Sequence, residues 1–158
     1  MTLLIGEFDL TPTQAAAIMG NIGHECAQFH TWHEKGQKEG KGGYGWAQWT
    51  GVRRQAFFAW LAKHPWIFDW RGDIANYLYL REELKTTQSS AIKSIKKESD
   101  LIRAVAEFEK KFERARPGKE GFDDRDRLAK IALDSYNERS FPAVLLYYIR
   151  SAIEGGMK

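Results

Sequence analysis

The chain has 158 residues, of which 43% are hydrophobic and 28% charged, and its formal net charge is +3. This composition is typical of a globular domain and excludes a disordered or membrane-embedded protein. A chain of this length buries enough surface for one core, so we expect a single domain over residues 1–158. The basic residues are interleaved with acidic ones, which argues against a nucleic-acid-binding module.

Two further features limit the setting in which the protein works. Cys26 is the one cysteine, which excludes an intrachain disulfide, and no uncharged run approaches the roughly 20 residues that span a bilayer. Residues 1–10 lack the basic segment and cleavage site of a secretory signal. We therefore expect no membrane span and a protein that stays in the cytoplasm until something else releases it.

The first clear helix signal lies at residues 11–14, which read Thr-Pro-Thr-Gln. Thr11 is placed as N-cap, Pro12 as first helical residue and Gln14 as the partner that closes a capping box. Apolar residues then recur at helical spacing as far as Cys26. Glu25 lies at the edge of this apolar face, near the C-terminus of the predicted helix.

The rest of the chain also has mostly helical spacing, so the predicted fold class is mainly α. A Gly- and Lys-rich stretch over residues 34–43 predicts a surface loop, and the alternation of small residues with aromatics in residues 43–50 predicts a short β-hairpin that lines a cleft. Further helices are predicted over residues 52–63, 73–85, 88–97, 100–115 and 125–137, with a last C-terminal helix over 141–154 capped by Ser140.

Two motifs carry a family resemblance. Gly20-Asn21-Ile22-Gly23-His24-Glu25, followed by Gly-Gly-Tyr-Gly-Trp-Ala-Gln-Trp-Thr-Gly-Val-Arg-Arg at residues 42–54, resembles the phage tail lysozyme family and, more distantly, the lytic transglycosylases. Phe-Glu-Arg-Ala-Arg-Pro-Gly at residues 112–118 is similar to a Pro-Gly segment of the same family, so the resemblance covers about residues 11–127. It implies a lysozyme-like fold, glycan strands of peptidoglycan as partner and substrate, and Glu25 as general acid.

Glycoside cleavage needs a carboxylic acid whose pKa lies well above its ordinary value. A helix C-terminus contributes only about 0.3–1 kcal/mol, whereas a shift of two pKa units takes roughly 3 kcal/mol. Burial must therefore supply most of the shift. We expect aromatic side chains near Glu25 to exclude water from it, namely Phe29, Trp32, Trp46 and Trp49.

The second catalytic group is open at this point. A hydrolase needs a further carboxylate about 5–9 Å from the acid, and Glu34, Glu39 and Glu113 are the candidates. Lytic transglycosylases, by resemblance, use one Glu and the 6-hydroxyl of the substrate instead. We favour a lysozyme (endolysin) that hydrolyses the bond between N-acetylmuramic acid and N-acetylglucosamine, with transglycosylation to 1,6-anhydro ends as the alternative.

Aromatic and amide side chains are the predicted substrate contacts, because sugar rings present flat C–H faces and hydroxyl groups. This set comprises Tyr44, Trp46, Gln48, Trp49 and Tyr77. For Trp46 and Trp49, a place in the core is the alternative interpretation. Arg53 and Arg54 are interpreted as a solvated first helical turn rather than as partners of Glu113.

No metal or other cofactor is predicted. His24 and Glu25 begin like a zinc-protease helix motif, but Gln28 stands where the second histidine is needed, and His30 and His33 have no third ligand nearby. A function of a different class, a non-catalytic wall-binding or tail structural protein, is the further alternative. We expect a monomer that is held in the host cytoplasm until lysis, or alternatively carried in a virion tail.

Overall fold

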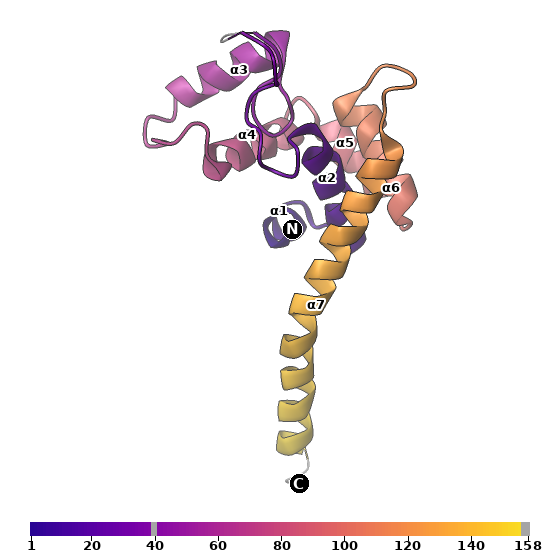
Figure 1. The fold of residues 1–158 in the computed structure, drawn as a ribbon. Coiled ribbons are helices and arrows are strands. Elements are labelled where there is room, and N and C mark those ends of the chain that lie inside the picture. Colours follow the sequence, from indigo (N-terminus) through magenta and orange to yellow (C-terminus); the bar gives the residue numbers. More distant parts are fainter. Residues whose placement is uncertain (39–40, 156–158) are drawn as a thin grey trace.

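The protein is built almost entirely from helices, as seen in a computed structural model that describes residues 1–38 and 41–155, with side chains to residue 139. Figure 1 shows that the shorter helices gather around α2, whereas the C-terminal part of α7 extends away from them. The mainly α fold class is confirmed. Along the described residues, no helix has both the length and the apolar character to cross a membrane. The helices are α1 (Thr2–Phe8), α2 (Pro12–Glu25), α3 (Gly51–Ala62), α4 (Asp73–Lys85), α5 (Ser89–Ile95), α6 (Leu101–Phe108), the π-helix η1 (Glu109–Glu113) and α7 (Phe122–Gly155).

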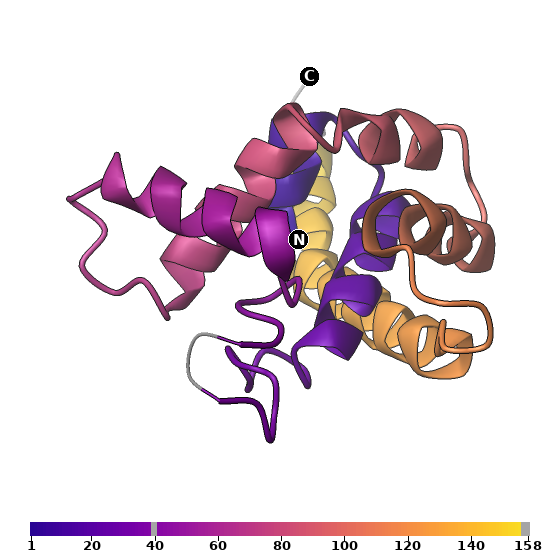
Figure 2. The same ribbon diagram turned by 90° about the horizontal axis from the view of Figure 1, so that it is seen from above.

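Helix α2 begins where the capping box predicts. The Thr11 hydroxyl accepts a hydrogen bond from the Gln14 amide at 3.2 Å, and the Gln14 side chain accepts one from the Thr11 amide at 3.0 Å. The Gln14 side chain also donates to the carbonyls of Lys96 and Glu98, which ties the start of α2 to the segment after α5. Helix α2 packs along both α6 and α7 (Figure 2). It is therefore the central helix of the fold.

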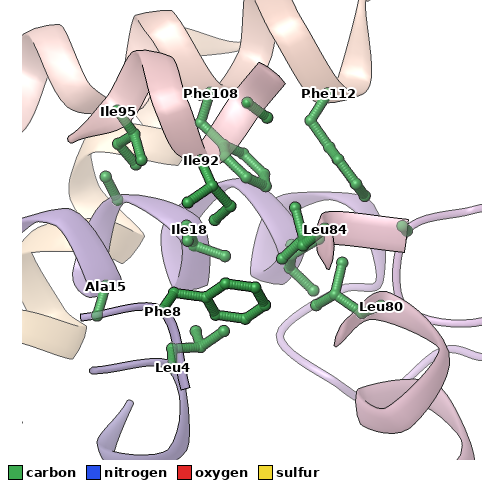
Figure 3. Packing of buried hydrophobic residues seen from close by; sticks show 14 of the residues in the cluster. Leu4, Phe8, Ala15, Ile18, Leu80, Leu84, Ile92, Ile95, Phe108 and Phe112 are labelled. Atoms are coloured by element: carbon green, nitrogen blue, oxygen red, sulfur yellow. The ribbon is translucent and has the colours of Figure 1, made fainter. Parts of the chain in front are cut away.

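Apolar side chains from most of the helices meet in one hydrophobic core around α2 (Figure 3). Ile18 of α2 is fully buried there, between side chains of α1, α4 and α6. Helix α1 was not predicted from the sequence, although Leu4 and Phe8 stand one turn apart. Both side chains are less than 9% exposed, so α1 closes one side of the core.

The helices predicted over residues 52–63, 73–85 and 88–97 are confirmed as α3, α4 and α5, with ends that differ by no more than two residues. Each carries buried apolar side chains, and those of α4 and α5 contact each other. Asn76 of α4 accepts a hydrogen bond from the Trp46 amide at 2.8 Å, so α4 also holds the loop of residues 43–50.

The helix predicted over residues 100–115 is present, but it changes from an α-helix to a π-helix along its length. It begins behind Asp100, whose carboxylate accepts a hydrogen bond from the Arg103 amide at 3.0 Å. The α-helix ends at Phe108, and the chain continues as the π-helix Glu109–Glu113. This wider turn sets the direction of the segment that follows.

In place of the predicted hairpin, the structure has isolated β-bridges. Within the described residues there is no strand, and Tyr44 forms single β-bridges with His33 and with Trp49. At the turn between Tyr44 and Trp49, Gly45 has a φ of 68°, and a Cβ there would lie 2.4 Å from both the Trp49 ring and the Asn76 amide oxygen. The segment is therefore a tight loop that packs against α4.

The two C-terminal helices predicted over residues 125–137 and 141–154 are one helix, Phe122–Gly155, so the predicted break is wrong. The residues between the two predictions contain no glycine, and Pro142 removes one backbone donor without preventing helical turns on both sides. Ser140, the predicted cap, lies outside the described side chains.

Candidate active site

A polar pocket of about 300 Å³ lies where the C-terminus of α2, the end of η1, the loop before α3 and the start of α7 meet. We call it the carboxylate pocket, because Glu25 and Glu113 both line it. The folding of distant segments around α2 brings these two carboxyl groups together. The lining residues are His24, Glu25, Ala47, Gln48, Thr50, Arg53, Glu113, Ala115, Lys119 and Arg125.

Glu25 is the last residue of α2 and lies at the open side of this pocket. Its side chain is 23% exposed, and its Oε1 accepts a hydrogen bond from Arg125 Nη2 at 2.5 Å. The ion pair fixes one oxygen of the carboxyl group. A partly exposed carboxyl held in this way can still contact a ligand in the pocket.

Arg125, in the first turns of α7, is a buried cation whose side chain is 1% exposed. Its Nη1 donates to the Asn21 carbonyl at 3.1 Å and to the Asn21 side-chain oxygen at 3.2 Å, and its Nε donates to the Glu120 carbonyl at 2.6 Å. A buried charge is tolerated only when it is paired and hydrogen-bonded. These bonds hold the guanidinium rigidly against Glu25.

Helices α2 and α7 lie close together, which allows Arg125 on α7 to reach Glu25 on α2. A Cβ on Gly20 would lie 2.5 Å from the Arg125 carbonyl oxygen and 2.6 Å from the Ala129 Cβ. Real Cβ atoms do not come so close to other atoms, so any larger residue at position 20 must push the two helices apart. Gly20 of the Gly-Asn-Ile-Gly-His-Glu motif therefore positions Arg125 for Glu25.

Glu113 supplies the second carboxyl group and is the more enclosed of the two. The residue as a whole is partly exposed, but one carboxylate oxygen, Oε1, is buried and has no hydrogen-bond partner among the described residues. Burial raises the pKa of Glu113 well above its ordinary range, and the negative charge of Glu25 raises it further. The opposing charges of Arg53 and Arg125 offset only part of this pKa shift.

The π-helix explains how Glu113 reaches the pocket. The Arg114 amide donates to the Glu109 carbonyl at 2.8 Å, five residues back, and Arg114 has a φ of 58° that ends the helix. The Glu109 carboxylate then accepts from the Ala115 amide at 2.8 Å. Because a π-turn holds one residue more than an α-turn, Phe112 stays in the core while Glu113 faces the pocket.

Arg53 forms the wall opposite α7. Its Nε and Nη2 donate to the two oxygens of Glu83 at 2.8 and 2.9 Å, and its guanidinium lies 4.6 Å from the centre of the Phe112 ring. The Trp49 indole donates to the same Glu83 carboxylate at 2.6 Å. Burial alone would lower the pKa of Arg53, but the pairing with Glu83 outweighs burial, and the pKa is raised. Arg53 is thus a fixed cation beside Glu113, not the solvated residue that the sequence indicated.

Of the three candidates for a second carboxylate, the structure brings only Glu113 to Glu25 in the part of the chain that it describes. Glu34 is exposed, and its carboxylate accepts from the Gly43 amide at 2.8 Å, so it stabilises the loop instead of lining the pocket. Glu39 lies outside the described residues.

The five predicted substrate contacts are distributed over several sites. Gln48 lines the carboxylate pocket, with its amide donating to the Gly45 carbonyl at 2.9 Å. Trp49 is fully buried and belongs to the core. Trp46 and Tyr77 line a separate apolar cavity of about 660 Å³, and Tyr44 lines a third pocket.

The aromatic wall expected around Glu25 lies elsewhere. The rings of Phe29 and Trp46 pack edge to face at 4.9 Å beside the apolar cavity, and Trp32 packs against Trp70. None of these rings lines the carboxylate pocket. The carboxyl that the fold encloses is Glu113, so burial acts on a different residue from the one the sequence indicated.

Among the described residues, no group of three or more histidine, cysteine or acidic side chains is placed to hold a metal ion. His24 Nδ1 is paired with Asp124 at 2.8 Å, and His33 Nε2 is bonded to the Lys41 carbonyl. Cys26 is buried, and burial raises the pKa of its thiol to about 12, which leaves it unreactive.

A helical fold around a pocket with two carboxyl groups, one of them enclosed, is typical of a small glycosidase. Comparison with known families agrees, because the model of the phage tail lysozyme family matches residues 1–136 and the chain belongs to this family. The match confirms the resemblance and includes both Glu25 and Glu113. Neither the curated proteins nor the solved structures gave a match. The protein is thus a lysozyme-like, glycosidase-type enzyme that degrades peptidoglycan.

Proposed function

We propose that the protein is a lysozyme that hydrolyses the bond between N-acetylmuramic acid and N-acetylglucosamine, with Glu25 as general acid and Glu113 as the second carboxyl group of the site. The observation that carries this proposal is the carboxylate pocket itself, in which an exposed carboxyl and an enclosed one lie between two fixed cations. Pairs of carboxyl groups in unequal surroundings divide acid and base roles between them.

Glu25 is the member of the pair that can reach a substrate. A general acid must come within hydrogen-bond distance of the leaving oxygen, and the Glu25 side chain is 23% exposed whereas Glu113 has one carboxylate oxygen, Oε1, buried. The Gln48 amide lines the same pocket and is placed to bind sugar hydroxyl or N-acetyl groups.

Glu113 supports this role because it favours its protonated form. Burial and the charge of Glu25 raise the pKa of Glu113, so this carboxyl can hold a proton in the pocket. Arg53 and Arg125 favour the charged form of Glu113, so the same pocket can stabilise this carboxyl once it has given up its proton.

One observation favours a second candidate function, lytic transglycosylation. In the described part of the pocket, one oxygen of Glu113 is buried without a partner, and a reaction in which the 6-hydroxyl of the substrate attacks needs only one group, Glu25, that acts as acid and then as base. The two reactions start with the same protonation by Glu25. They differ in the nucleophile and therefore in the product.

Mass spectrometry of purified peptidoglycan digested by the enzyme tests the proposal. Hydrolysis leaves reducing N-acetylmuramic acid ends, transglycosylation leaves 1,6-anhydro ends, and glucosaminidase activity leaves reducing N-acetylglucosamine ends. We expect the first. Products of amidase or peptidase cleavage alone would contradict a glycosidase.

The family supports a phage origin and action on the bacterial cell wall. Within that setting we propose a free endolysin that is held in the host cytoplasm until lysis, with a virion-tail component as the alternative. Mass spectrometry of purified virions separates the two, because a tail component copurifies with the particle.

A further inference from the structure

A second pocket, of about 450 Å³, lies beside the loop that carries Tyr44. Its walls combine flat aromatic rings with two guanidinium groups, and we call it the aromatic–arginine pocket. Nothing in the proposed reaction uses these side chains. They are Trp32, Tyr44, Phe58, Trp70, Arg54 and Arg71.

Both arginines stack on rings instead of pairing with acids. The Arg71 guanidinium lies 4.3 Å from the centre of the Trp32 ring and 4.5 Å from that of Trp70, and Arg54 lies 5.3 Å from the Tyr44 ring. Among the described side chains, neither forms an ion pair with a carboxylate. Arg54 Nη1 donates to the carbonyls of Lys41 and Gly42 at 2.8 and 3.1 Å, whereas the stacked Arg71 guanidinium keeps its in-plane donors available for an anion.

Tyr44 adds an unsatisfied polar group to the same pocket. The residue is 2% exposed, and its hydroxyl is buried with no hydrogen-bond partner. Its ring stacks on Trp70 with an interplanar angle of 19°. Buried hydroxyl groups normally have a well-formed partner, so this hydroxyl beside the Arg71 guanidinium indicates a place where a polar ligand completes the structure.

A hollow of about 320 Å³ at the start of α3 adjoins both the aromatic–arginine pocket and the carboxylate pocket. This hollow shares Thr50 with the carboxylate pocket and shares Arg54 and Phe58 with the aromatic–arginine pocket. We call the three hollows together the track. Arg53 lines the carboxylate pocket at one end of it, and its neighbour Arg54 lines the other two hollows. A track of this kind suits a polymer that extends beyond the bond being cut.

We propose that the aromatic–arginine pocket binds an acidic unit of the glycan strand, a sugar ring that carries a carboxylate, while the scissile bond lies in the carboxylate pocket. This inference rests on the proposed function. Aromatic rings cover the C–H face of the sugar, and the guanidinium of Arg71 binds the carboxylate through two parallel hydrogen bonds. The carboxylate belongs either to the lactyl group of N-acetylmuramic acid or to the stem peptide attached to it.

Calorimetric titration tests this binding in a Glu25→Gln background, so that strands are not cut. The probes are peptide-free glycan strands with free lactyl carboxylates, the same strands with these carboxylates reduced to alcohols, and the isolated stem peptide. Arg71→Gln should weaken binding of the carboxylate strands about tenfold or more, the loss expected for a charge-assisted hydrogen bond. It should leave the affinity for the reduced strands unchanged.

The matched control is Arg103→Gln, which removes an exposed arginine of α6 that lies outside the track. Trp70→Ala should weaken both kinds of strand, because both present sugar faces for stacking. If Arg71→Gln lowers the melting temperature, Arg71→Lys replaces it, and its weaker anion binding should give an intermediate affinity.

The outcomes separate the two sources of the carboxylate. Binding of carboxylate strands that depends on Arg71 identifies the lactyl group, and binding of the isolated stem peptide with the same dependence identifies the stem. Equal affinities of Arg71→Gln and Arg103→Gln for every probe would overturn the inference. A Glu25→Gln protein that still cuts the strands would contradict the proposed general acid but not this inference. The affinities of the Arg71→Gln and Arg103→Gln variants can still be compared, because both variants carry the same Glu25→Gln change.

Discussion

Arg125 Nη2 lies 2.5 Å from Glu25 Oε1 and joins the start of α7 to the last turn of α2. Because the guanidinium is buried and bonded to Asn21 and Glu120 as well, the ion pair is part of the helix packing. Stability and the position of the proposed acid are therefore linked in this fold.

Arg125→Met should lower both stability and activity. The variant leaves the Asn21 and Glu120 carbonyls without their donor and Glu25 without its cation, and we expect the free energy of unfolding to fall by about 3 kcal/mol in urea denaturation. Arg127→Met is the control, because Arg127 is 52% exposed and its pair with Asp124 should contribute less than about 1 kcal/mol. Equal and small losses for the two variants would show that the buried ion pair is not a structural support.

Gly20→Ala should separate α2 from α7. The added methyl group would lie 2.5 Å from a backbone oxygen, which cannot move without its helix, so we expect a loss of about 1–3 kcal/mol in unfolding free energy together with reduced activity. Gly6→Ala is the matched control in α1, where nothing lies within 4 Å of the added Cβ. That change should stabilise the protein by up to about 1 kcal/mol. A Gly20→Ala protein that is also stabilised would contradict the close helix contact.

Glu113 should make stability depend on pH. Its pKa in the folded protein lies above the ordinary 4.5, so the folded state binds more protons than the unfolded state as the pH rises past that value. The contribution of Glu113 to stability is therefore complete below about pH 4.5 and is lost as the pH approaches the raised pKa, by at most about 1.4 kcal/mol per pH unit. Glu113→Gln lacks this dependence. Urea denaturation of both proteins from pH 4 to 8 should show wild type losing stability relative to the variant, and parallel curves would contradict a buried, protonated Glu113.

Local sequence patterns were sufficient for much of the fold. The capping box at Thr11 and Gln14 fixed the start of α2 because both hydrogen bonds form within one turn. Apolar spacing likewise located α3 to α6. The same local reasoning failed at Pro142, where a residue that often begins a helix lies inside one.

The candidate site was only partly predictable, since its contacts join segments that are distant in the chain. Glu25 and Gln48 stand in motifs and were named from them, but Arg125 had no local signal that distinguished it from a solvated arginine at a helix start. The unpredicted π-turn directs Glu113 into the pocket. Spacing along the chain does not reveal which acidic residue the completed fold will enclose, and so the burial expected at Glu25 is found at Glu113.

In the proposed reaction, Glu25 delivers the proton that cleaves the glycan strand. The most direct measurement is the rate at which Glu25→Gln releases soluble fragments from purified peptidoglycan, compared with wild type and with Glu34→Gln, after circular dichroism has shown that each variant folds. Gln keeps the size of the side chain but has no proton to transfer, so the rate should fall at least about 100-fold, whereas Glu34→Gln should stay within about threefold of wild type. A folded Glu25→Gln protein with the wild-type rate would contradict the assignment of the acid.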